Sequence, residues 1–372
     1  MRLVGSCLFG VVSAIFSLLL SGCGSALVVY DVRGNWTVSA VEIAKGLYVP
    51  TETVVPCAGY TNEFLTAQRM EVEEREWNLL MRWRDSDGGV LRSFTVPDTV
   101  TTDLRLSSTG RRLMVPVRQW AREETRGTWK LLVRTEGETV SEFREVFSLP
   151  VDGMVYSFDW IDDDRAILAC LKTRAEDAAD SVGEGYYLID SRDKTAAKLD
   201  LGLCPCGWPD AAKVLGCPDR MFPINIYQYR RPCGAAVADG RARRFAIPDV
   251  RKGIYVFDSD SFHPVFSCID VKLPYCAFDT NGDIVAWGLD DWARLSPDGR
   301  ILGLGRLRGW LIVDYAGSGL FYCQSRDGSD YGTVSRESRK YLVSENGEVL
   351  GELPRARWMC SRMADGRILF QQ

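Results

Sequence analysis

Short runs of alternating apolar and polar residues cover most of the chain, and turns rich in Asp, Asn and Gly separate them. Such runs predict β-strands with one buried face, joined as hairpins. One hairpin pattern recurs at residues 27–41, 79–96, 131–149, 186–201, 254–271, 293–307 and 341–353. A second pattern, a strand and a Gly or Asp turn before a short apolar strand, lies at 44–49, 106–117, 158–170, 237–247, 277–287, 313–323 and 361–370.

The two hairpin patterns alternate along residues 27–372, and one pair of them fills four strands. Four-stranded antiparallel sheets repeated every roughly 40 to 55 residues are typical of a β-propeller. The chain begins with one pattern and ends with the other, so we expect six complete blades and a seventh formed by pairing 361–370 with 27–41. This closure would leave no long sheet edge exposed between the termini. The all-β chain is therefore expected to be a seven-bladed β-propeller, although six or eight blades are compatible with the same pattern.

Two turn sequences resemble those of known propeller families. "SPDGR" at 296–300 and "ADGR" at 364–367 are similar to the turns of WD40-like and TolB-like repeats. The resemblance spreads over nearly the whole body of the chain and implies a propeller. The tryptophan-docking pattern of quinoprotein blades is not visible, which counts against a quinone, and we expect no cofactor.

The first 22 residues have the pattern of an export signal. Arg2 supplies positive charge, an apolar run follows, and the run ends in Leu20-Ser21-Gly22-Cys23. These four residues resemble the bacterial lipobox, which implies that residues 1–22 are removed and that Cys23 receives diacylglycerol and a fatty acid such as palmitate. Residues 23–26 would then be a lipidated tether. An uncleaved transmembrane anchor is the alternative, because the apolar run is just long enough to span a bilayer.

The lipobox resemblance implies an address in the bacterial cell envelope. Gly24 follows Cys23, which by analogy with enteric lipoproteins permits sorting to the outer membrane, facing the periplasm or the cell surface. The net charge of −5 is spread along the chain, so we expect no nucleic-acid partner. A single histidine, His263, argues against a His-based metal site or a Ser-His-Asp triad, and we expect no metal.

The longest departure from the repeat is an insertion at about 203–234. It holds Cys204, Cys206, Cys217 and Cys233, which we expect to form disulfides in an oxidising compartment, with the pairing open. A four-thiolate zinc site is the alternative, although Cys-x-Cys is not its usual spacing. Four other cysteines occupy repeat-equivalent strand positions and are expected to be small buried hydrophobic residues, namely Cys170, Cys276, Cys323 and Cys360.

Basic residues gather next to this insertion in the sequence. They are Arg230, Arg231, Arg241, Arg243, Arg244, Arg251 and Lys252. We expect the first five to face an anionic partner, such as a glycan, a lipid head group or an acidic protein. An ordinary solvated surface is the alternative.

Three further patterns could indicate a metal site or a catalytic residue, and each has a simpler explanation. The acids and amide at 279, 281, 283 and 290 are spaced somewhat like a calcium loop, but Asn281-Gly282 fits a tight hairpin turn better. Asp162, Asp163 and Asp164 offer carboxylates for acid–base catalysis, yet consecutive acids in a turn are usually solvated. His263 lies in an expected turn and is expected to be exposed, so we assign no catalytic residue.

These features favour a lipid-anchored scaffold that binds or assembles a protein or an envelope polymer. Propellers with this address include the lipoprotein of the outer-membrane β-barrel assembly machinery, which the chain resembles in layout. The alternative is an extracytoplasmic enzyme, a glycan hydrolase or lyase with carboxylates at the propeller centre. Fold alone does not decide between the two.

Overall fold

The structure is a computed structural model, and the regular elements of its described residues are β-strands. It describes residues 27–33, 37–44, 52–55, 64–73, 76–85, 89–96, 105–106, 113–120, 127–133, 144–149, 154–171, 184–205, 234–239, 242–325, 339–353, 358–362 and 368–371. Within these residues, 28 strands pair into seven four-stranded sheets. Every described pairing between neighbouring strands is antiparallel.

Six of the sheets use four consecutive strands each. The first three are β3 (Glu52–Val55), β4 (Phe64–Glu73), β5 (Glu76–Arg84) and β6 (Val90–Val96); β7 (Arg105–Leu106), β8 (Leu113–Trp120), β9 (Gly127–Val133) and β10 (Arg144–Leu149); and β11 (Met154–Trp160), β12 (Arg165–Leu171), β13 (Gly185–Asp190) and β14 (Thr195–Leu199). The next three are β15 (Val237–Asp239), β16 (Arg244–Asp249), β17 (Gly253–Asp258) and β18 (Pro264–Cys268); β19 (Tyr275–Phe278), β20 (Ile284–Trp287), β21 (Asp291–Leu295) and β22 (Ile301–Arg306); and β23 (Trp310–Gly317), β24 (Leu320–Ser325), β25 (Lys340–Ser344) and β26 (Val349–Glu352).

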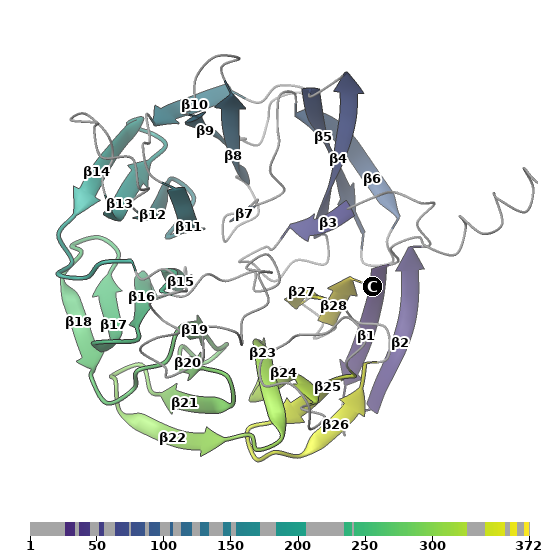
Figure 1. Cartoon of the computed structure of the whole chain (residues 1–372), viewed down its shortest axis with the longest axis vertical. Coiled ribbons are helices and arrows are strands. Elements are labelled where there is room, and N and C mark those ends of the chain that lie inside the picture. The colour runs from purple at the N-terminus through teal and green to yellow at the C-terminus, as the bar shows by residue number, and fades with distance from the viewer. Residues whose placement is uncertain are drawn as a thin grey trace, which may run out of the picture.

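The sheets are arranged around a common centre (Figure 1). The first strand of each sheet, such as β11 or β15, lies near the centre, and the fourth strand, such as β14 or β18, lies at the rim. Radial sheets around an axis are the architecture of a β-propeller. The all-β propeller fold that the hairpin pattern predicts is therefore the fold of this chain.

The remaining sheet combines the two ends of the described chain. Its order is β2 (Thr37–Ala44), β1 (Leu27–Arg33), β28 (Ile368–Gln371) and β27 (Trp358–Arg362). β1 pairs with β28 in a register that runs from Leu27 opposite Gln371 to Tyr30 opposite Ile368. This is the terminal pairing that the hairpin pattern predicts.

One predicted hairpin is misplaced. The pattern put the first two strands of the β3–β6 sheet at 44–49, but Ala44 ends β2, and those strands are β3 and β4. The glycine of "AKGLYV" was interpreted as their turn, whereas residues 56–63 separate β3 from β4, a longer interval than between the first two strands of the other sheets.

The core lies between neighbouring sheets. Tyr186 of β13 packs with Phe245 and Phe257 of the next sheet, and all three side chains are almost fully buried. Two sheets further on, Trp287 of β20 lies 6.2 Å from Tyr315 of β23, measured between ring centroids. Each large aromatic ring buried in this way contributes hydrophobic stabilisation to two sheets at once. The sheets are consequently rigid supports for the turns that join their strands.

The insertion joins β14 to β15, and its residues 206–233 lie outside the described part of the chain, as do residues 1–26. Among the residues that are described, none forms a helix with the length and apolar character needed to cross a membrane.

Candidate functional site

Turns of two kinds give the propeller two different faces. In each sheet, the turns between strands one and two and between strands three and four lie at one end, and we name this end the turn face. Its described turns include 161–164, 191–194, 259–263, 279–283, 296–300 and 345–348. The links between strands two and three, and between successive sheets, form the opposite connection face. It includes 250–252, 269–274, 288–290 and 307–309.

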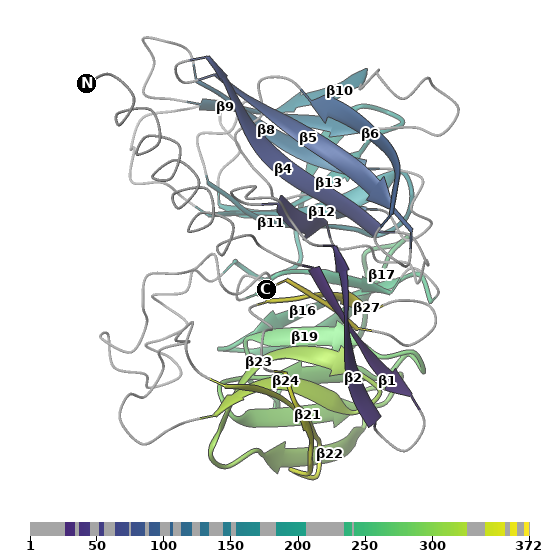
Figure 2. The ribbon, with the colours of Figure 1, turned by 90° about the vertical axis from the view of Figure 1, so that its right-hand side faces the viewer.

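Hydrogen bonds between links support this division. On the connection face, the amide of Gly234 donates to the carbonyl of Pro274 over 3.1 Å, and the amide of Leu307 donates to the carbonyl of Asp290 over 2.8 Å. On the turn face, the amide of Ser259 donates to the carbonyl of Arg243 over 2.8 Å. Each face is thus held by contacts among its own links. Figure 2 shows the sheets from the side, with the two faces at opposite ends of the strands.

Short polar side chains shape many of the turns. Oδ1 of Asp162 accepts hydrogen bonds of 2.8 Å from the backbone amides of Asp164 and Arg165. Asp258 accepts from the amide of Ser261 over 2.7 Å. Carboxylates that bond amides two or three residues ahead stabilise turns without any other partner. The acids at 162–164 are therefore turn residues, as expected, but they are half-buried, and Asp162 and Asp164 pair with Arg165 and Arg192 rather than facing only solvent.

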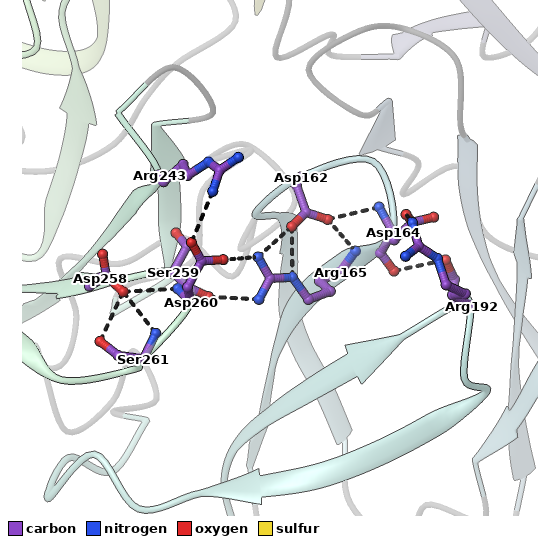
Figure 3. A network of polar contacts seen from close by, with 10 residues as sticks. Asp162, Asp164, Arg165, Arg192, Arg243, Asp258, Ser259, Asp260 and Ser261 are labelled. Atoms are coloured by element: carbon purple, nitrogen blue, oxygen red, sulfur yellow. Dashed lines mark hydrogen bonds and ion pairs between the residues drawn. The ribbon is translucent and has the colours of Figure 1, made fainter.

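A cluster on the turn face ties two neighbouring sheets together (Figure 3). Arg165, at the start of β12, donates from Nε to Asp162 Oδ2 over 2.7 Å. Its other nitrogens reach the next sheet, where Nη1 donates to the carbonyl of Ser259 over 2.9 Å and Nη2 to Asp260 Oδ1 over 2.8 Å. Arg243 approaches the same Asp260, with 3.2 Å between Nη1 and Oδ2. The planar guanidinium suits this task because it donates in several directions at once.

The same contact recurs one sheet further along. Arg244, at the start of β16, donates from Nη1 to the carbonyl of Pro297 over 2.7 Å. Arg165 and Arg244 thus occupy equivalent places, each following the first turn of its sheet and reaching the second turn of the next. The repeat of the fold is also a repeat of this inter-sheet contact.

A third cluster surrounds Arg294 of β21. Its Nη1 lies 2.9 Å from Asp279 Oδ2 and 3.0 Å from Asp283 Oδ2, both in the first turn of the same sheet. Its Nη2 lies 2.5 Å from Oε1 of Glu345, in the second turn of the next sheet, and donates to the hydroxyl of Tyr315 over 3.2 Å. Arg294 is only 15% exposed, so these charges interact with little screening by water.

This cluster shows what the acids of the calcium-like pattern contact. Asp279 and Asp283 both turn toward the guanidinium of Arg294, while Asp290 is engaged by Arg306, with 3.0 Å between Oδ2 and Nε. The predicted hairpin turn is confirmed, because the amide of Gly282 donates to the carbonyl of Asp279 over 3.0 Å. The part of the chain that the structure describes contains no group of three or more His, Cys, Asp or Glu residues arranged to hold a metal ion.

Four carboxylates of the turn face have pKa values that are lowered by their surroundings. The hydrogen bond from Arg165 lowers the pKa of Asp260. Burial is the largest single influence on Asp279 and opposes its ionisation, but the hydrogen bonds from Arg294, from Tyr315 and from the amides of Thr280 and Ser318 together outweigh it, and the pKa is lowered. Hydrogen bonds from nearby serines lower the pKa of two more, Asp258 and Asp298. A general acid needs a raised pKa, so these four groups are suited to holding turns rather than to donating protons.

The structure separates the predicted basic surface into parts. Arg230, Arg231 and Arg241 lie outside the described residues. Arg243 and Arg244 follow the C-terminal end of β15, whereas the insertion rejoins the fold before its N-terminal end. The other two basic residues of that run, Arg251 and Lys252, lie on the connection face, where Nζ of Lys252 donates to the carbonyl of Gly202 over 2.5 Å.

The cysteine predictions have different outcomes. Cys170, Cys276 and Cys323 are buried and are not in disulfides, and burial raises the pKa of Cys170 to about 12, so they are confirmed as small buried hydrophobic residues. Cys204 is exposed at the start of the insertion. The proposed disulfide partners, at positions 206, 217 and 233, the lipidation site at position 23 and the side chain at position 360 all lie outside the described residues. His263 is exposed at the end of the turn at 259–263, as expected.

Sequence reasoning missed three residues that the structure singles out. Two are the inter-sheet arginines Arg165 and Arg294. The third is Lys340 of β25, which is 3% exposed and donates from Nζ to Gln324 Oε1 over 2.9 Å. Burial lowers the pKa of Lys340 to about 8. The recurrence of arginine directly after a first turn, in "DDDR" and "RARR", is a signal that could have identified Arg165 and Arg244.

Comparisons with known proteins match architecture only. No family model matches the chain, and no curated protein matches its sequence. Among solved structures, the β-propeller domain of Myceliophteria thermophila Cps50 (Swd1) is similar over 86% of this chain and 99% of its own, with 10% identity and a TM-score of 0.47. BamB from Moraxella catarrhalis is similar over 90% of this chain and 88% of its own, with 11% identity and a TM-score of 0.42.

Proposed function

We propose that the chain is a lipid-anchored, extracytoplasmic scaffold of the bacterial cell envelope that binds or assembles a protein or an envelope polymer. Its body would be a closed propeller of seven blades, and its anchor would be the lipid on Cys23, in an outer membrane. We expect partner contact to involve the insertion at 203–234, which its four cysteines would order. No nucleic acid, metal or cofactor takes part in this proposal.

The observation that best supports the proposal is that charged side chains on the turn face connect neighbouring sheets. Arg165, Arg244 and Arg294 tie one sheet to the next, and Asp260 and Asp279 are ionised in contact with them. These charged groups stabilise the relative positions of the sheets. A surface held in this way is preorganised for binding, which reduces the entropy lost when a partner docks.

The alternative is an enzyme that cleaves a glycan, and one experiment separates the two. A photo-cross-linking amino acid is placed in living cells at Asn281 or Glu348 on the turn face, or at Arg308 on the connection face, all of which are exposed. A scaffold gives discrete cross-linked products from one face, and the purified chain releases no reducing ends from envelope glycans. Glycan cleavage that is abolished by Asp279→Asn or Asp260→Asn would contradict the scaffold.

A further inference from the structure

The two faces of the propeller differ in their relation to the proposed anchor. β1 is the third strand of its sheet, and its first residue, Leu27, lies opposite Gln371 at the end of the second strand, β28. In the other sheets, the end of strand two and the start of strand three belong to the connection face. The chain therefore enters the propeller from the connection face.

The distance from the anchor to this face is short. Three residues, Gly24 to Ala26, separate Cys23 from Leu27. Four consecutive Cα steps span at most about 15 Å. A lipid on Cys23 would thus hold the start of β1 within that distance of the membrane surface, which leaves the turn face on the far side of the sheets.

A patch on the opposite side of the ring has the chemistry of a membrane contact. Ile269, in the link between β18 and β19, is 60% exposed. The other exposed large apolar side chains of the described residues belong to the outer strands β6, β18, β22 and β26. Ile269 is therefore distinct in being exposed on a face of the propeller.

Three exposed cations lie in the same two links as Ile269. Arg251 and Lys252, in the link between β16 and β17, and Lys272 are all exposed, against one exposed acid in the same two links, Asp270. The two links are in direct contact, because a Cβ on Gly253 would lie 2.7 Å from the Cα of Ile269. An exposed apolar side chain among lysine and arginine is suited to the interface of a bilayer with anionic head groups.

We infer that the connection face rests against the anchoring membrane, and that Ile269, Arg251, Lys252 and Lys272 contact anionic lipid there. This inference rests on the proposed lipid anchor. The anchor belongs to the sheet of β1 and the patch to the sheet of β15–β18, which lies across the ring (Figure 1). Two contacts on opposite sides of one face fix the tilt of the propeller. The turn face then points away from the membrane, whereas the insertion at 203–234, which links β14 to β15, leaves and rejoins the sheets on the connection face.

Lysine labelling tests the orientation residue by residue. The full-length chain is purified from membranes in a neutral detergent and reconstituted on vesicles of phosphatidylglycerol and phosphatidylcholine, or of phosphatidylcholine alone. An amine-reactive reagent then labels Lys252 and Lys272 on the connection face and Lys194 on the turn face, all of which are exposed. On anionic vesicles we expect labelling of Lys252 and Lys272 to slow several-fold relative to detergent, with Lys194 unchanged and with a smaller effect on phosphatidylcholine alone.

A matched pair of variants tests the patch itself. Ile269→Ser should restore much of the labelling of Lys272 on vesicles, whereas Val265→Ser, on the outer strand β18, should not. A melting curve verifies that both variants are folded. Slower labelling of Lys194, equal slowing at all three lysines, or no slowing at all overturns the orientation.

The intact mass of the same sample keeps the two proposals apart. A lipidated Cys23 without protection of Lys252 and Lys272 refutes the orientation and leaves the anchor standing. Protection of those lysines in a chain without lipid supports the contact of the patch with anionic lipid and refutes the anchor.

Discussion

Arg294 and Glu345 belong to neighbouring sheets, and Nη2 of the arginine lies 2.5 Å from Oε1 of the glutamate. The same guanidinium also holds Asp279 and Asp283 of its own sheet. One side chain thus joins three carboxylates across the boundary between two blades. This contact, with those of Arg165 and Arg244, gives the propeller a repeated polar link on its turn face.

Removing this guanidinium should destabilise the fold. Arg294→Met leaves three partly buried carboxylates without their cation, and we expect a loss of about 2–4 kcal/mol in the free energy of unfolding. Urea unfolding measures it. The matched control is Arg300→Met, because Arg300 and its partner Asp298 are both largely exposed, and its cost should stay below about 1 kcal/mol. Equal stability of the two variants would show that the Arg294 cluster does not hold the two sheets together.

The buried Lys340 predicts a dependence of stability on alkaline pH. Its pKa is lowered from 10.5 to about 8 by burial, so the folded state binds fewer protons than the unfolded state between these values. The penalty for burying the charge is fully present below about pH 8 and disappears as the pH rises toward 10.5. Lys340→Met should therefore be more stable than the wild type near neutral pH, by up to roughly 3 kcal/mol, and the gain should shrink as the pH rises.

Urea unfolding at several pH values between about 8 and 10.5 follows this difference. Lys272→Met, at an exposed lysine, is the control and should show no such trend. A Lys340→Met protein that is less stable than the wild type at every pH would mean that the contact with Gln324 outweighs the cost of burial.

Two glycines of the outer strand β22 accommodate Trp292. A Cβ on Gly305 would lie 2.5 Å from the indole nitrogen, whereas one on Gly303 would lie 3.2 Å from the ring. Gly305→Ala should displace the indole and cost about 1–3 kcal/mol, and Gly303→Ala should cost less. Urea unfolding gives the order, and tryptophan fluorescence reports the displacement. Equal costs for the two substitutions would contradict this explanation of the glycines.

The terminal sheet predicts that the last strands are needed by the whole fold. Deleting residues 361–372 removes β28 and leaves β1 paired with β2 alone. Because the ring would open and two strand edges would be exposed, the melting temperature should fall by more than roughly 5 °C. Removing Gln372 alone, which follows β28, is the control and should have little effect. An unchanged melting temperature after the longer deletion would rule out a structural role for the terminal pairing.

The sequence predicted the sheets well because each hairpin carries its own local signal. "FDTNGDIV" and "SPDGR" combine alternation with turn residues, and both form the expected turns. The hairpin of β3 and β4 was misplaced at 44–49, because residues 56–63 separate these two strands and a glycine beside a short apolar run lies just before them in the sequence. A turn signal identifies a hairpin only where its two strands are close together in the sequence.

The inter-sheet contacts were not predictable in the same way. Arg165 and Asp260 are 95 positions apart, and Arg294 and Glu345 are 51 apart. Their meeting depends on how neighbouring sheets pack, which no pattern within one hairpin contains. The acids of these clusters looked like candidates for metal binding or catalysis because the sequence showed the carboxylates and not the arginines that pair with them.

The scaffold and its orientation both depend on a lipid at Cys23, so the intact mass of the mature protein is the most direct test of the account. We predict that the chain purified from membranes begins at Cys23 and carries the added mass of a diacylglycerol and a fatty acid, and that Cys23→Ser abolishes this product. A mature chain that retains residues 1–22, or a Cys23→Ser protein that stays membrane-bound at the normal processed mass, would contradict the account.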